Sequence, residues 1–92
     1  MNPSICIPKI DSTVTKGFIL SVFNRYNFGE IKRIDVINRN NDKRAFIHFK
    51  NWNKDDRSVR VRKFLELGDD FKIMYMEPWF WKCTVLHKKT RN

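Results

Sequence analysis

The clearest pattern in the chain is a strict alternation of apolar and polar positions over residues 43–49. One side of this segment carries Ala45, Ile47 and Phe49. The other side carries Arg44, Phe46 and His48. Because successive side chains of a strand point to opposite faces of a sheet, the pattern predicts a half-buried strand. The second set then lies on the outward face, away from the core.

The first third of the chain predicts a strand followed by a helix. We expect a short strand over residues 4–10 that ends near Pro8, since proline cannot donate to a sheet ladder. Residues 11–13, Asp-Ser-Thr, are typical helix caps. Apolar residues then recur at helical spacing, which predicts a helix of about 12 residues ending at Tyr26. Gly29 would take the left-handed conformation after it.

The rest of the chain predicts three or four further elements. We expect a strand over residues 30–37, a polar turn over 38–42, and two extended pieces over 71–76 and 80–87 that Pro78 separates. Between them, a second helix would begin at Asn53 or at Asp55-Asp56 and run to about Leu67. Its buried stripe would consist of Val61, Phe64 and Leu65. In the last strand Lys82 must point outward, so that Trp81, Cys83 and Val85 point inward.

The order of these elements is strand, helix, strand, strand, helix, strand, with an extra short strand before the last. This order predicts an α+β domain of the ferredoxin-like βαββαβ type, with a four-stranded antiparallel sheet and two helices on one face. We expect one domain over residues 4–87 and a basic tail over residues 88–92, which contains Lys88, Lys89 and Arg91.

The composition and net charge of the chain indicate which class of partner it binds. The 92 residues are 41% hydrophobic, enough for a packed core, and carry a net charge of +9, which favours nucleic acid as the partner. No apolar run is long enough for a membrane span, and no signal-peptide pattern precedes the domain. Cys6 and Cys83 do not form a disulfide framework, so we expect a reducing compartment, cytoplasm or nucleus. Abundant Lys, Ile and Asn are typical of an organism or virus with an AT-rich genome.

Two segments carry a resemblance to a known family. Residues 42–49, DKRAFIHF, resemble the third-strand octamer of the RNA recognition motif, and residues 5–10, ICIPKI, resemble its first-strand hexamer. The resemblance implies single-stranded RNA bound on the outward face of the sheet. Among the outward positions of the family's boxes only Phe46 keeps an aromatic residue, while Arg44 and Cys6 replace the others.

The resemblance and the charge together predict a non-catalytic nucleic-acid-binding domain, with single-stranded RNA favoured and without cofactor or metal. No set of carboxylates or activated nucleophiles indicates an enzyme. Phe46 would stack a base, with Arg44 and His48 beside it. The remaining predicted contacts are to phosphates, from Arg33, Arg39, Lys43 and Lys82.

Two alternatives remain open. The first is a protein-interaction module on a degenerate RNA-recognition fold, which would use its sheet or the corner at Trp79–Trp81, with Trp79 and Phe80 as the candidate contacts. These two side chains would otherwise pack over a helix end. The second is a basic protein that coats nucleic acid without sequence preference.

Overall fold

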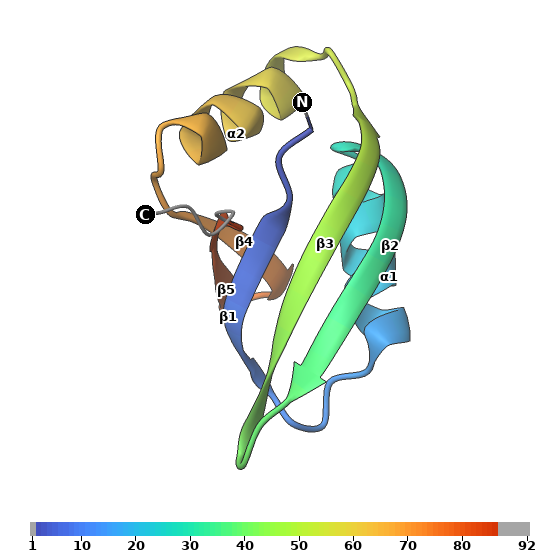
Figure 1. Cartoon of the computed structure of the whole chain (residues 1–92), viewed down its shortest axis with the longest axis vertical. Coiled ribbons are helices and arrows are strands. Elements are labelled where there is room, and N and C mark those ends of the chain that lie inside the picture. The colour runs from blue at the N-terminus through green and yellow to red at the C-terminus, as the bar shows by residue number, and fades with distance from the viewer. Residues whose placement is uncertain (1, 87–92) are drawn as a thin grey trace, which may run out of the picture.

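A computed structural model describes residues 2–86, so the predictions for His87 and for the basic tail lie outside the described residues. These residues form two helices and five strands, whose arrangement Figure 1 shows. The elements in chain order are β1 (Ile5–Asp11), α1 (Lys16–Tyr26), β2 (Gly29–Asn38), β3 (Asp42–Trp52), α2 (Asp56–Glu66), β4 (Phe71–Met76) and β5 (Trp79–Val85). The α+β class is confirmed.

The sheet is antiparallel and has five strands in the order β2-β3-β1-β5-β4. The prediction of a four-stranded sheet is therefore wrong. The segment expected as an extra extended piece forms a hairpin with β5 and becomes the edge strand. β5 contacts two partners in succession, because its beginning pairs with β4 and its end, Thr84 and Val85, pairs with β1.

β1 does not end near Pro8 but continues to Asp11. Its pairing with β3 shifts by one residue between Ile7 and Ile10. This bulge lets the strand pass a residue without an N–H group. It also turns Ile10 back into the core, where it is 1% exposed, on the side that Ile7 occupies. The prediction that the strand ends near Pro8 is therefore wrong, because the sheet accommodates the proline in a bulge.

The ends of α1 also differ from the prediction. Thr15, not a residue of the 11–13 cluster, is the N-cap, because its hydroxyl accepts a hydrogen bond from the Phe18 N–H (3.1 Å). Asn27, not Gly29, takes the left-handed conformation after the helix, with φ of 56°. Gly29 is required for a different reason. A Cβ at this position would collide with the backbone of Asn51 on β3.

The core lies between the inward face of the sheet and the two helices. The inward apolar residues of the strands and the buried apolar residues of both helices form one cluster. From α1 it includes Ile19, Val22 and Phe23. The prediction for α2 is only partly correct: Asp55 is the N-cap and Leu65 is buried, but Val61 is half-buried and Phe64 is 38% exposed.

Hydrogen bonds and ring contacts join the β4–β5 hairpin to α1. The Tyr26 hydroxyl donates to the Met74 carbonyl (2.9 Å) and accepts from the Met74 N–H (3.2 Å). Phe18 packs edge-on against the rings of Tyr75 and Trp81, each 6.0 Å away between centroids. Trp81 is 4% exposed, as the alternation of the last strand predicts. Tyr26 thus occupies backbone groups of an edge strand that would otherwise be free to pair with another chain.

Candidate nucleic-acid interface

The outward face of β1, β2 and β3 brings the predicted stacking residue to the middle of the sheet. Phe46 lies opposite Cys6 of β1 on one side and opposite Asp35 of β2 on the other. Along β3 it is flanked by Arg44 and His48, which share its face by alternation. All three residues of β3 are half-buried. The face therefore presents one aromatic ring between two nitrogen-bearing side chains.

Arg44 has no carboxylate partner within residues 2–86. Its Nε is buried without a hydrogen bond there. A buried donor without an acceptor costs roughly 1–3 kcal/mol. The guanidinium also lies close enough to Cys6 to oppose the rise in the pKa of that thiol, a rise which burial causes. Arg44 is thus a cation on the outward face whose charge no side chain in the described part of the chain neutralises.

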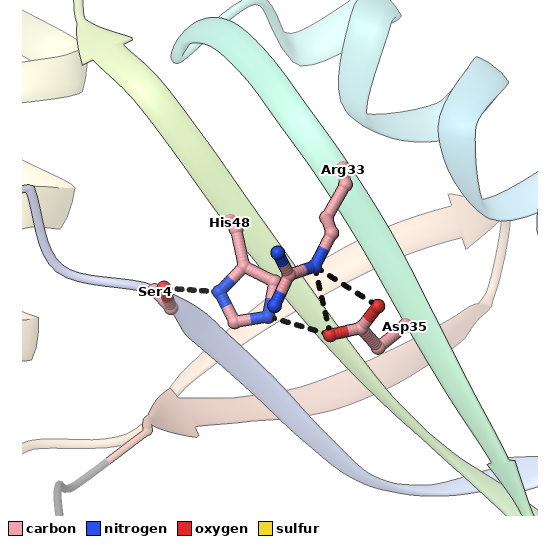
Figure 2. A network of polar contacts seen from close by, with 4 residues as sticks. All are labelled: Ser4, Arg33, Asp35 and His48. Atoms are coloured by element: carbon pink, nitrogen blue, oxygen red, sulfur yellow. Dashed lines mark hydrogen bonds and ion pairs between the residues drawn. The ribbon is translucent and has the colours of Figure 1, made fainter.

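Arg33 and His48 belong to a polar network at one end of this face (Figure 2). The Arg33 Nε donates to both carboxylate oxygens of Asp35 (3.1 Å each). The His48 ring lies between Asp35 (Nε2 to Oδ2, 3.0 Å) and the Ser4 hydroxyl (Nδ1 to Oγ, 2.9 Å). The hydrogen bond from Arg33, followed by that from His48, lowers the pKa of Asp35 below its ordinary value despite some desolvation. At neutral pH Asp35 is therefore ionised.

Sequence reasoning missed Asp35 and Ser4 as members of the site. The alternation of β2 would have indicated Asp35, since it lies two residues after the outward Arg33. Ser4 carries no such signal, because it precedes the first strand and meets His48 only through the pairing of β1 with β3.

The other predicted phosphate contacts are more scattered. Arg39, at the tip of the β2–β3 hairpin, donates to Asp42 (2.8 Å) and to the Pro8 carbonyl (3.1 Å). Lys43 is on the inward side of β3, where its ammonium donates to the Val14 carbonyl (2.8 Å), so it does not join the outward face. Lys82 is exposed on β5 and lies 3.2 Å from a carboxylate oxygen of Asp70. Exposed ion pairs of this kind are weak, so Arg39 and Lys82 stay accessible to phosphate.

Trp79 and Phe80 are exposed, at 61% and 46%, and do not pack over a helix end. The pairing of β4 with β5 places them opposite two further exposed apolar residues, Met76 and Met74. The Lys72 ammonium lies 4.8 Å from the centroid of the Phe80 ring. The β4–β5 hairpin therefore carries an exposed apolar surface.

The two cysteines occupy opposite faces, as predicted. Cys6 is outward, paired with Thr84, and the neighbouring Cys83 is inward and fully buried. Burial raises the pKa of both thiols. No group of three or more metal-ligating side chains occurs within residues 2–86. Neither helix of that part of the chain is long and apolar enough to cross a membrane.

Comparisons of the chain with protein-family models, with curated proteins and with solved structures find no match.

Proposed function

We propose that this domain binds single-stranded nucleic acid, RNA in preference to DNA, on the outward face of β1, β2 and β3, without catalysis. The fold is then a ferredoxin-like, RNA-recognition-motif arrangement of β1, α1, β2, β3, α2 and β5, with β4 inserted as an additional edge strand. Resemblance in the octamer over residues 42–49 supports this proposal, and so does the net charge of +9.

The observation that carries the proposal is the position of Phe46 beside the unpaired Arg44. A half-exposed ring in the middle of a sheet offers a base a stacking surface that tolerates any sequence. A guanidinium without a carboxylate partner binds phosphate or stacks on a base, and it does not first have to break an ion pair. Arg33 on β2 and Arg39 at the tip of the β2–β3 hairpin add further positive charge.

The test is a titration of labelled single-stranded RNA, single-stranded DNA and duplex against the full chain at several salt concentrations. Phe46→Ala is expected to weaken single-strand binding by roughly 1–3 kcal/mol, the cost of one stacked base. Phe64→Ala is the matched control, since it removes the same ring from an exposed site on α2. Equal affinities of Phe46→Ala and wild type at every salt concentration would refute the proposal.

The contribution of charge is separated by a second pair of variants. Arg44→Gln is expected to lower the slope of log affinity against log salt by about one unit, because one phosphate contact is lost. Arg60→Gln removes the same charge from an exposed position on α2 and is expected to leave the slope unchanged. If both variants change the slope equally and duplex binds as well as single strands, the domain coats nucleic acid through its overall charge.

The β4–β5 hairpin supports a second candidate function, binding of a protein partner. Trp79, Phe80, Met74 and Met76 form an exposed apolar surface on one hairpin, and exposed Trp and Met are enriched at protein interfaces. Trp79→Ala is expected to leave RNA affinity unchanged if this surface serves a different partner. A loss as large as that of Phe46→Ala would assign the hairpin to the RNA site.

A further inference from the structure

A pocket of about 450 Å³ lies at the end of the outward face where the Ser4 and His48 side chains meet. Its lining comes from four places in the chain: the segment before β1, β2, β3 and the residue after β5. The volume falls in the range of sites that hold small ligands. Phe46 does not line it, so the pocket is distinct from the stacking surface.

One wall of the pocket is held in place by hydrogen bonds. The Trp52 indole donates to the Pro3 carbonyl (3.0 Å), and the Leu86 N–H donates to the Ser4 carbonyl (3.0 Å). The Asn2 amide donates to a backbone carbonyl of β3 (2.9 Å). The segment before β1 is thus tied to the sheet on both sides, so the wall is formed before any ligand binds.

The opposite wall presents two cations. The hydrogen bonds that Arg33 makes within residues 2–86 use only Nε, while its terminal nitrogens remain available, and its side chain is 59% exposed. Lys32 is exposed beside it. The Asp35 carboxylate accepts hydrogen bonds from the Arg33 Nε and also contacts the His48 ring (Figure 2). The two terminal nitrogens of an arginine oriented in this way match two oxygens of a phosphate.

The apolar part of the lining comes from Pro3, Phe49 and Leu86. A ligand that fits the pocket therefore combines an anionic group with a flat or apolar body. We infer that the pocket binds one nucleotide of the single strand, with the phosphate on Arg33 and Lys32 and the base against Pro3 and Leu86. The inference rests on the proposed nucleic-acid function and adds a nucleotide subsite at a defined end of the sheet.

The experiment uses the isotope-labelled full chain and follows its backbone amide signals during titration with uridine 5′-monophosphate. The amides of Ser4, Arg33 and His48 are expected to shift together. Uridine and inorganic phosphate, titrated separately, are each expected to bind roughly tenfold more weakly, because each makes only one half of the contacts. Phosphate binding as tightly as the nucleotide would overturn the assignment of a base to the pocket. Shifts spread over the whole surface would overturn the pocket itself.

Variants separate this inference from the proposed function. Arg33→Gln is expected to weaken nucleotide binding roughly tenfold, while Arg60→Gln, with the same loss of charge, leaves it unchanged. Phe46→Ala is expected to keep nucleotide binding and to lose oligonucleotide affinity. If only the oligonucleotide effect appears, the pocket inference is wrong and the proposed function stands. If only the nucleotide effect appears, the pocket binds a free nucleotide, and the proposed binding of a single strand on the sheet is wrong. Dispersed amide signals confirm that each variant is folded.

Asp35→Asn tests whether Asp35 positions Arg33. This substitution makes the chain more positive, so charge alone would strengthen binding of the nucleotide. Loss of the hydrogen bonds from the Arg33 Nε to the two Asp35 oxygens is expected to weaken nucleotide binding and to shift the Arg33 Nε–H signal. Stronger nucleotide binding by the variant would show that Asp35 competes with phosphate and does not orient the arginine.

Discussion

Removing one hydroxyl from Tyr26 should loosen the β4–β5 hairpin from α1. The change Tyr26→Phe keeps the ring, which stacks on Phe28 with 5.6 Å between centroids. It abolishes the two hydrogen bonds between the hydroxyl and the backbone of Met74. Each net hydrogen bond contributes about 0.5–1.5 kcal/mol to stability. Because water can reach this surface site and replace part of the loss, we expect a destabilisation of about 1–2 kcal/mol.

The assay is urea unfolding followed by tryptophan fluorescence. For a small domain the dependence of the unfolding free energy on urea is about 1–3 kcal/mol per molar, so the midpoint should fall by about 0.3–2 M. The Met74 amide should also exchange its hydrogen faster, since its N–H loses its acceptor. Exposure of the β4 edge should increase self-association at high protein concentration.

Tyr75→Phe is the matched control, because the Tyr75 hydroxyl makes no hydrogen bond within residues 2–86 while its ring stacks on Trp81 at 4.5 Å. This variant should unfold at the wild-type midpoint. The reasoning fails if Tyr26→Phe and Tyr75→Phe unfold together, or if exchange at Met74 is unchanged in the first variant.

Three further outcomes are expected. Gly29→Ala should destabilise the fold by roughly 1–3 kcal/mol, because its Cβ meets the backbone of β3. Gly17→Ala on α1, whose Cβ would make only an ordinary contact with the Thr15 hydroxyl (3.9 Å), should stabilise the fold by up to about 1 kcal/mol; thermal unfolding compares the two variants. Cys6 and Cys83 should resist a thiol reagent in the folded chain and react in urea, since burial raises the pKa of both; rapid reaction without urea would contradict the burial. Asp35 has a folded pKa below the unfolded value of about 3.9, so the unfolded state binds protons first as the pH falls. The stability that Asp35 contributes is present above about pH 4 and lost below it, and Asp35→Asn should reduce the acid sensitivity of the urea midpoint.

The alternation along β3 and β5 was determined by the sequence alone. Residues 43–49 form part of a strand with Phe46 outward, and the register of the last strand places Cys83 inward. Both predictions depend on a local rule, because neighbouring side chains of a strand point to opposite faces wherever that strand lies. The cap at Asp55 is equally local, since its carboxylate accepts from the backbone N–H of Ser58, three residues away.

Long-range pairing decided the rest. The five-strand order and the bulge at Pro8 depend on which strands meet and in what register, and no local pattern contains that information. Lys43 was predicted to contact phosphate because it is basic, but the chain before α1 brings the Val14 carbonyl to its ammonium. The contacts of His48 with Ser4 and with Asp35 also depend on strand pairing, whereas the Arg33–Asp35 ion pair is local to β2. The sequence supplies these groups, while the pairing of β1 and β2 with β3 sets the distances between them.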